Sequence, residues 1–354
     1  MNTTERLENL VKWGKAVEAL RSGYREGALQ TDHPFGMALA RARGINPWFT
    51  EEQILYALNG IAHMLDEQAL RSWLAAYPEL GKFPQKRLDI GLVLAGNIPA
   101  VGFHDILCVL VSGHTAQVKR SSDDPILLPF LLDVLAEIAP SMASDIRFVD
   151  RISDPGAVIA TGSDNSARYF DYYFGKYPHI IRRNRNSVAV LDGRERIEDL
   201  QALGSDIFSF YGLGCRNVSK LLVPMGYAMD DFFMAMESYG GVIRHNKYMN
   251  NYDYHKALYL LNQEPFLTNN FLIVREHESL ATPVSVLHVE RYTDSADATS
   301  RLNRDRDRIQ CVVGVGHLPF GTSQSPGPAD YADGVDTLAF LTGLGNPAQN
   351  TKPL

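Results

Sequence analysis

Among the side chains that could do chemistry, one cysteine stands out by its neighbours. Cys215 lies in the segment YGLGCRNVSKLLVP (211–224), where Gly212 and Gly214 precede it and Arg216 follows it. Glycines let the backbone approach a ligand closely. A helix-like turn is expected after Cys215, and a helix N-terminus beside a cation favours the nucleophilic thiolate. The pattern predicts a thiol nucleophile, although a single cysteine is more often a buried packing residue.

The other two cysteines lie in different surroundings. Cys108 in FHDILCVLV and Cys311 in RIQCVVGV are enclosed by apolar residues, which predicts buried packing roles for both. An odd, sparse count of three cysteines argues against a disulfide framework and favours a reducing compartment. Their spacing is not that of a zinc site, so no metal site is expected.

Polar side chains follow two predicted strands, where each strand ends. Asn97 closes the apolar run LDIGLVLAGN, and its amide could donate a hydrogen bond to a developing oxyanion. Asparagine also ends strands in ordinary turns, which is the alternative interpretation. Lys119, Arg120 and Ser121 follow the strand TAQVK. This cationic, hydroxyl-bearing group suits a ribose and its 2′-phosphate, or it is simply a solvated loop.

A third turn carries small residues between a strand and a helix. Thr161, Gly162 and Ser163 follow the strand AVIA and precede a predicted helix. Such a turn presents backbone N–H groups to an anion at the helix N-terminus. The G-x-G-x-x-G pattern of common dinucleotide sites is missing, so this motif is weak by itself.

The elements that must position these residues alternate between strands and helices. The first 80 residues have helical periodicity, and Thr50 with the two glutamates after it predicts a capped helix start. After them, strands are expected at 88–97, 115–119, 146–149 and 157–160, and helices at 99–111, 125–140 and 164–174. Alternation with short connections predicts a parallel sheet with helices on its faces, which is an α/β architecture of nucleotide-binding type.

A second run of elements follows. Strands are expected at 187–193, 221–224, 271–274, 284–290 and 309–315, with helices at 196–210 and 335–341. The expected organisation is residues 1–187 as N-terminal helices and dinucleotide-binding domain, 188–330 as catalytic domain, and 331–354 as C-terminal helix and tail.

Composition narrows the class of protein. The 354 residues include 34 Lys and Arg against 41 Asp and Glu, for a formal net charge of −7, so no overall basic field favours nucleic-acid binding. The longest apolar runs, at 98–111 and 126–139, are too short and too interrupted to span a bilayer. The N-terminus has no signal-peptide pattern, and a cytoplasmic location is expected.

Four segments, taken in chain order, resemble the aldehyde dehydrogenase superfamily. Residues 97–125 resemble its first cofactor segment, in which a Lys follows an Asn at a fixed distance. Residues 158–170 resemble its TGS turn and helix, 211–224 its catalytic G-x-x-C segment, and 276–292 its E-x-FGPV segment. LAGNIP, GLGCRNVSKL and residues 319–341 are similar, more closely, to the long-chain fatty acyl-CoA reductases, the reductase component of bacterial bioluminescence operons and its relatives.

The resemblance implies a Rossmann-like cofactor domain, an α/β catalytic domain, and reduction of a fatty acyl thioester to an aldehyde with NADPH, or with NADH. Cys215 would carry the acyl group, and Asn97 with the Cys215 N–H would form the oxyanion hole. Glu276 is an alternative to Glu278 at the nicotinamide ribose, because the spacing to Pro283 is one residue longer than in the family. The implied cofactor-binding residues are Lys119, Arg120, Ser121, Thr161, Gly162, Ser163 and Glu278.

The chain departs from the family in the stretch RRNRNSVAVLDG (182–193), which lacks the ELGG glutamate that activates water in aldehyde-oxidising members. Arg182, Arg183 and Arg185 in this stretch could meet coenzyme A or carrier-protein phosphates, or form a solvated basic face. The implied partners are acyl-CoA or an acyl carrier protein, an acyl-activating enzyme and further copies of this chain. Competing hypotheses are an aldehyde dehydrogenase, a reductase of another acyl donor, a cysteine acyltransferase or thioesterase without nicotinamide, and a catalytically silent scaffold.

Overall fold

The computed structural model describes residues 2–29, 32–78, 80 and 86–344. The chain forms two compact units. The first unit consists of Met1–Arg183 together with Pro326–Leu354, and the second unit of Asn184–Ser325. The described part of the C-terminal segment, residues 326–344, is thus part of the first unit.

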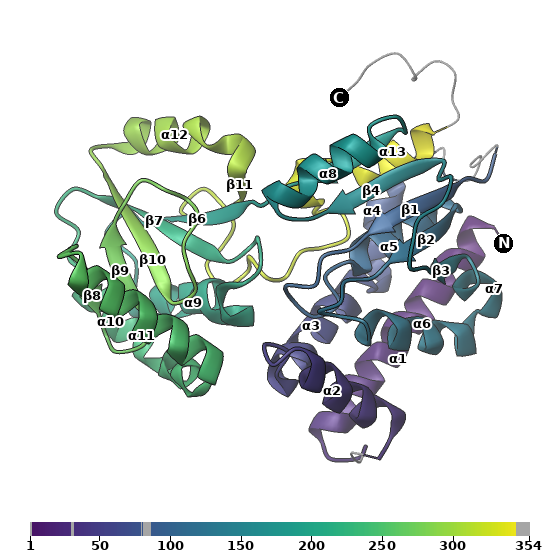
Figure 1. Cartoon of the computed structure of the whole chain (residues 1–354), viewed down its shortest axis with the longest axis horizontal. Helices are drawn as coiled ribbons and strands as arrows, with labels where there is room; N and C mark the ends of the chain where they lie inside the picture. Colours follow the sequence, from purple (N-terminus) through teal and green to yellow (C-terminus); the bar gives the residue numbers. More distant parts are fainter. Residues whose placement is uncertain (1, 30–31, 79, 81–85, 345–354) are drawn as a thin grey trace. The chain divides into compact units, whose positions relative to one another are not determined.

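A five-stranded parallel sheet organises the first unit (Figure 1). Its strands are β1 (Asp89–Val93), β2 (Thr115–Lys119), β3 (Ile146–Phe148), β4 (Ala157–Thr161) and β5 (His179–Arg182). Their order is β3-β2-β1-β4-β5. The chain moves outward in one direction from β1 to β3 and then crosses back to β4, so the strand order reverses between β1 and β4. Ligands of such sheets bind beyond the carboxyl ends of the strands at this reversal.

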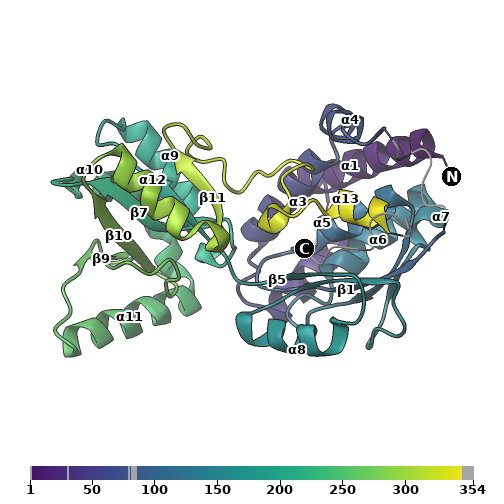
Figure 2. The same ribbon diagram turned by 90° about the horizontal axis from the view of Figure 1, so that it is seen from above.

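Helices cover both faces of this sheet. They are α1 (Thr3–Arg25), α2 (Pro34–Ile45), α3 (Glu51–Met64), α4 (Glu67–Ala75), α5 (Phe103–Ser112), α6 (Leu127–Ile138), α7 (Pro140–Ala143), α8 (Asp164–Phe174) and α13 (Thr337–Gly343). Figure 2 shows α8 on one face and α5, α6 and α13 on the other. The side chain of Thr50 accepts a hydrogen bond from the Gln53 N–H, which confirms the predicted start of α3.

Two predicted helix boundaries in this unit are wrong. The helix expected from residue 99 begins only at Phe103, because Ala100 has a φ of 53°, which a right-handed helix does not allow. The carboxylate of Asp124, which is buried, accepts the Ala100 N–H at 2.7 Å and holds this turn. The helix expected over 125–140 ends at Ile138, and Pro140 instead begins the short helix α7.

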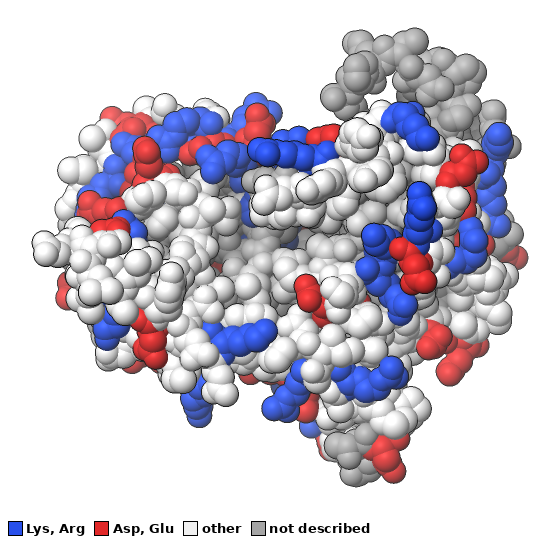
Figure 3. Space-filling model, viewed as in Figure 1, with Lys and Arg blue, Asp and Glu red and all other residues white. Residues whose placement is uncertain are grey.

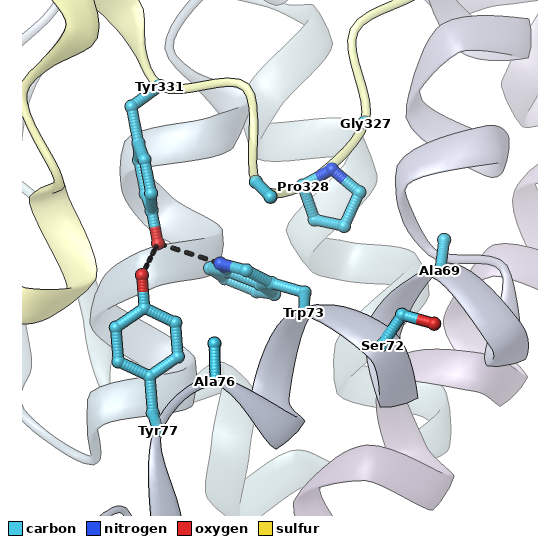
Figure 4. A pocket seen from close by; sticks show the side chains of 9 residues that line it. Ala69, Ser72, Trp73, Ala76, Tyr77, Gly327, Pro328 and Tyr331 are labelled. Carbon is cyan, nitrogen blue, oxygen red and sulfur yellow. Dashed lines mark hydrogen bonds between the residues drawn. The ribbon is translucent and has the colours of Figure 1, made fainter.

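Hydrogen bonds between aromatic side chains join the C-terminal segment to α4 and the residues that follow it. The predicted helix 335–341 is α13, two residues further along, and it packs on α5. The Trp73 indole N–H donates to the hydroxyl of Tyr331 at 2.7 Å, and the Tyr77 and Tyr331 hydroxyls are 2.6 Å apart (Figure 4). Around these rings, α4 and residues 327–331 line an apolar pocket of about 370 Å³.

The second unit is built on a six-stranded sheet of order β11-β6-β7-β10-β9-β8. Its strands are β6 (Asn186–Val190), β7 (Val218–Pro224), β8 (Leu267–Thr268), β9 (Ile273–Glu276), β10 (Val286–Tyr292) and β11 (Ile309–Gly314). Only the β8–β9 pair is antiparallel. The α-helices are α9 (Ile197–Phe208), α10 (Asp230–Met236), α11 (Asn246–Leu261) and α12 (Ser295–Arg304). Figure 1 shows α12 separated by strands from α10 and α11.

Charged side chains of both signs lie on the face that Figure 3 presents. Lys and Arg side chains are interspersed there with Asp and Glu. Within the described part of the chain, no helix combines the length and the apolar character needed to cross a membrane.

Candidate active site

The segment before Cys215 reverses direction through three left-handed residues. Phe210, Tyr211 and Gly212 have φ values of 52°, 57° and 77°, in a short 3-10 segment (Ser209–Gly212) that follows α9. For the two residues other than glycine, this conformation costs about 1–3 kcal/mol each. Burial of both aromatic rings offsets that cost, and the Tyr211 ring lies 4.5 Å from the His245 ring. We call residues 213–217, which this reversal presents, the nucleophile loop.

Cys215 is exposed at the turn of the nucleophile loop. The helix expected after it is absent: a turn leads directly into β7 at Val218. The prediction that a helix N-terminus acts on this thiol is therefore wrong. The guanidinium of Arg216 donates through Nε to the carbonyl of Ser323 at 2.5 Å, so this cation is bonded to the segment that returns to the first unit.

Asn217 holds the nucleophile loop in place from inside the unit, a role that no local sequence pattern indicates. Its side chain is 2% exposed. Its amide nitrogen lies 3.1, 3.3 and 2.8 Å from the carbonyl oxygens of Asp206, Ile207 and Ser209, to which it donates. Its amide oxygen accepts the Gly214 N–H at 2.8 Å. One buried side chain thus ties the end of α9 to the residue before the cysteine.

Ser187, on the neighbouring strand β6, is a second support. It is fully buried, and its hydroxyl donates to the carbonyl of Cys215 at 3.0 Å and accepts the Cys311 N–H at 3.2 Å. The Cys311 sulfur lies 3.1 Å from the same hydroxyl oxygen. Cys311 is only half-buried, so its predicted burial in a strand core is not what the structure has. Cys108 is fully buried as predicted, and burial raises the pKa of its thiol.

A buried carboxylate fastens the neighbouring chain segment. Asp206 of α9 accepts the N–H groups of Gly321 and Ser323 at 2.6 and 2.9 Å. Burial raises the pKa of Asp206, and these hydrogen bonds counter part of that rise. Together with the Arg216 contact, they hold residues 321–323 close to the nucleophile loop. The segment PFGTSQ (319–324) belongs to the stretch that resembles the reductase family. Its sequence does not indicate that Asp206 and Arg216 are its hydrogen-bond partners.

In the first unit, the loops after β1 and β2 meet at the carboxyl edge of the sheet. Asn97 is exposed in the loop after β1. A Cβ added at Gly96 would overlap the Ser121 side chain, so only glycine allows these two loops to approach so closely. Lys119 and Arg120 are exposed at the end of β2. Arg120 donates to the Pro125 carbonyl at 3.1 Å and lies over the Phe148 ring, 5.1 Å from its centroid.

The turn after β4 lies on the other side of the strand-order reversal. Thr161 ends β4, and Ser163 caps α8 by accepting the Ser166 N–H at 3.3 Å. A Cβ on Gly162 would come within 2.8 Å of the Ser166 Cβ, so glycine permits the close packing of strand and helix there. This turn, the first N–H groups of α8 and the exposed Lys119 form an edge that suits the phosphates and ribose of a dinucleotide.

Glu278 lies in the second unit, between β9 and β10, and is exposed. Glu276, the alternative, ends β9 and forms an ion pair with Arg291 at 2.6 Å. The loop that carries Glu278 runs beside the start of β7, because the Ser219 hydroxyl donates to the Leu280 carbonyl at 2.7 Å. Ser219 follows Cys215 by four residues, so this unit brings the two candidate segments close to the same end of β7.

Of the three arginines expected to form a basic cluster, Arg182 is buried, whereas Arg183 is exposed and Arg185 is half-buried. Arg182 is 4% exposed, and its Nη1 donates to both carboxylate oxygens of Asp105 at 2.8 and 2.7 Å. Its Nη2 donates to the Thr337 hydroxyl at 2.8 Å. Arg183 pairs with Asp171 at 3.2 Å. Arginine composition alone could not distinguish this buried ion pair from a surface cluster, because the partners lie 77 and 155 residues away.

No model of a known protein family matches this sequence, and comparison with curated proteins gives no match. Solved structures do match. An NADP dependent enzyme of E. coli is 13% identical over 88% of this chain and 73% of its own, with a TM-score of 0.62. An aldehyde dehydrogenase of Bacillus cereus, solved with NAD+, is 12% identical over 88% and 72%, with a TM-score of 0.59. Aldehyde dehydrogenase 21 of Physcomitrella patens is 14% identical over 89% and 74%, with a TM-score of 0.58.

These similarities establish the fold. The chain has the aldehyde dehydrogenase-like fold, with a Rossmann-like unit and an α/β unit that carries the exposed cysteine. That architecture agrees with the one expected from the sequence.

Proposed function

We propose that this protein is a nicotinamide-dependent oxidoreductase that reduces a fatty acyl thioester to an aldehyde through an acyl-enzyme on Cys215. One observation carries the proposal. In an aldehyde dehydrogenase-like fold, the exposed Cys215 stands on a loop whose backbone is fixed from within by Ser187 and Asn217. A nucleophile that must meet a carbonyl in one orientation benefits from such fixed support.

In the acylation step, the Cys215 thiolate attacks the thioester carbonyl. The Asn97 amide and the Cys215 backbone N–H are the proposed donors to the oxyanion that develops. Expulsion of the carrier thiol, which takes up a proton, leaves the acyl group on Cys215 as a new thioester. Acyl-CoA is the proposed donor, and an acyl carrier protein supplied by an acyl-activating enzyme would present the same chemical group.

The residues at the sheet edge fit a nicotinamide dinucleotide. Lys119 is the proposed ligand of the adenosine ribose, with Arg120 and Ser121 at a 2′-phosphate, which makes NADPH the proposed reductant over NADH. Thr161, Gly162 and Ser163 would lie along the diphosphate, and Glu278 would bind the nicotinamide ribose. When bound, the nicotinamide supplies the hydride. The same donors at Asn97 and Cys215 would hold the thiohemiacetal oxygen, and breakage of its C–S bond releases the aldehyde and the thiol.

The stretch 182–193 supports reduction over oxidation to an acid. Arg182, near its start, is in the buried pair with Asp105. The carboxylate in this stretch, Asp192, is bonded to Arg194, which lowers its pKa. A carboxylate with a lowered pKa is a poor general base. Water activation would therefore be inefficient, and an acyl-enzyme would survive until it is reduced.

The test is loss of NADPH or NADH absorbance with acyl-CoAs from acetyl to hexadecanoyl, with acyl phosphates as competing donors. We expect acyl-CoA-dependent oxidation of NADPH, and one acyl group on Cys215 by mass spectrometry when the cofactor is omitted. Cys215→Ala should abolish both, whereas Cys311→Ser should retain acylation. NADPH oxidation that persists in Cys215→Ala contradicts the proposal. Acylation of the wild type without any nicotinamide oxidation would indicate an acyltransferase or thioesterase instead.

A further inference from the structure

Three consecutive backbone carbonyls around Glu278 are each held by a buried side chain. The ammonium of Lys220 donates to the Glu278 carbonyl at 2.6 Å. The His288 Nδ1 lies 2.8 Å from the Ser279 carbonyl oxygen, and Ser219 donates to the Leu280 carbonyl at 2.7 Å. We call these three donors, Ser219, Lys220 and His288, the carbonyl clamp.

The clamp comes from two adjacent strands whose register brings its members together. Lys220 of β7 and His288 of β10 are direct partners in the parallel ladder. The three side chains are between 1% and 8% exposed, whereas Glu278 itself is exposed. The exposed carboxylate of Glu278 therefore extends from a backbone whose carbonyls are hydrogen-bonded to buried side chains of the sheet.

The charge of Lys220 is compensated inside the unit. Its ammonium forms an ion pair with Glu290, which Arg301 and Arg304 also contact. Burial alone would raise the pKa of Glu290, but Lys220 and the two arginines lower it below its ordinary value. Glu290 is thus ionised at neutral pH, and the ammonium keeps its remaining hydrogen-bonding capacity for the Glu278 carbonyl.

His288 can serve the clamp only in one state. A carbonyl oxygen accepts, so Nδ1 carries the proton in the bond to Ser279. Burial lowers the pKa of His288 to about 4, with further contributions from the neighbouring His277, Arg275 and Lys220. The neutral imidazole with its proton on Nδ1 is therefore the form present at neutral pH. The ring of His277, tilted by 39° with its centroid 4.6 Å from that of His288, accepts the Ser279 N–H. This N–H belongs to the same peptide group as the Glu278 carbonyl, so that peptide is held on both sides.

We propose that Ser219, Lys220 and His288 are positioning residues that fix the backbone beneath Glu278 and so set the carboxylate that binds the nicotinamide ribose. This inference rests on the proposed function of Glu278. Without the clamp, the loop would sample several conformations, and binding would have to order it at a cost in conformational entropy. The clamp should therefore govern the reduction step and leave acylation of Cys215 unaffected.

The test separates these two half-reactions. Lys220→Met, Ser219→Ala and His288→Ala each remove one donor, and His288→Asn retains a donor at the position of Nδ1. Tyr292→Phe is the matched control, because it removes a buried bond from β10 to a different carbonyl, that of Leu191. For each variant, acylation by hexadecanoyl-CoA is followed by mass spectrometry without cofactor. The KM for NADPH and the rate of the reduction step are then measured on the acyl-enzyme.

We expect the donor-removing variants to raise the KM for NADPH or slow reduction by about 10- to 100-fold, with the rate of acylation unchanged. His288→Asn should recover most of the loss, and Tyr292→Phe should behave as wild type. Lys220→Met removes a buried charge and could fail to fold. In that case Ser219→Ala and His288→Ala, which each remove one hydrogen bond and no buried charge, test whether the clamp governs the reduction step.

Glu278→Gln distinguishes the two ways in which the experiment can fail. If this variant impairs reduction and the clamp variants do not, the clamp has no positioning role and the proposed function stands. Equal losses in acylation and reduction, or a loss in His288→Asn as large as in His288→Ala, also overturn the inference. A wild-type protein that neither acylates nor oxidises NADPH overturns both.

Discussion

Two asparagines define the contrast between the two units. Asn97 follows β1 at the edge of the first sheet and is exposed, in a loop that depends on a glycine contact for its path. Asn217 follows the cysteine of the second unit, and it is 2% exposed with hydrogen bonds to four backbone groups. An exposed amide can bind a substrate atom, whereas a buried, satisfied amide can only shape the backbone that presents another residue.

The same contrast extends to the surroundings of each asparagine. Around Asn97, the candidate ligands Lys119 and Arg120 are exposed and solvated. Around Asn217, the supports Ser187 and Asp206 are fully buried. Substitutions at the exposed residues of the first unit should therefore change binding or catalysis and leave stability nearly unchanged. Substitutions at the buried supports of the second unit should lower the free energy of unfolding.

Among the substitutions that compare the two units, the largest effect is expected at the exposed asparagine. Asn97→Ala should lower the rate constant for acyl-CoA reduction by about 100- to 1,000-fold, because it removes one proposed donor to the oxyanion. The free energy of unfolding should stay near the wild-type value, since the side chain is exposed. Steady-state kinetics and urea denaturation check the two halves of this prediction. A variant with full activity would remove Asn97 from the mechanism.

The buried asparagine should respond in the opposite way. Asn217→Leu removes the partners of three carbonyls and one N–H, so the free energy of unfolding should fall by about 4 kcal/mol at roughly 1 kcal/mol for each group. Asn251→Ala is the control, since its exposed amide bonds only the Lys247 carbonyl on the same helix. Chemical denaturation measures both variants. If both variants lose the same small amount of unfolding free energy, Asn217 does not hold the nucleophile loop in place.

The sequence predicted one side of this contrast better than the other. Exposed candidates such as Cys215 and Asn97 stand out because glycines and strand ends mark them locally. Asn217 and Arg182 were missed or misread, because their roles depend on partners that the fold brings from elsewhere in the chain. Apolar runs located most strands, but the strand expected over 88–97 ends at Val93 and the short strand β8 was not predicted. The start of α5 was also missed, since a positive φ at Ala100 is held by the buried Asp124.

Acid should weaken the second unit through His288. Its pKa falls from 6.5 in the unfolded chain to about 4 in the folded one, so between these values only the unfolded chain binds the proton. The corresponding stability is fully present above pH 6.5 and is lost as the pH falls to 4, by at most about 3 kcal/mol. His104 and His114 of the first unit also have pKa values lowered by burial, so the whole chain should be acid-sensitive.

Comparison of wild type with His288→Asn isolates that contribution. Urea denaturation at pH 7 and pH 5, followed by hydrogen exchange of peptides from β9 and β10, should show a smaller loss of protection in the variant. An identical pH dependence in both proteins would mean that His288 does not titrate in this window.

The smallest effect is expected at the edge of the first sheet. Arg120→Ala should raise the KM for NADPH by about 10-fold, the equivalent of one charge-assisted hydrogen bond to a 2′-phosphate, and should leave the KM for NADH unchanged. The reason is that Arg120 is exposed at the end of β2, where its guanidinium lies over the Phe148 ring. Equal changes for both nucleotides would mean that Arg120 supports the loop through its bond to the Pro125 carbonyl. Arg120 would then stabilise a loop, as Asn217 does in the second unit. Asn97 would remain the one exposed residue of this comparison with a proposed role in binding.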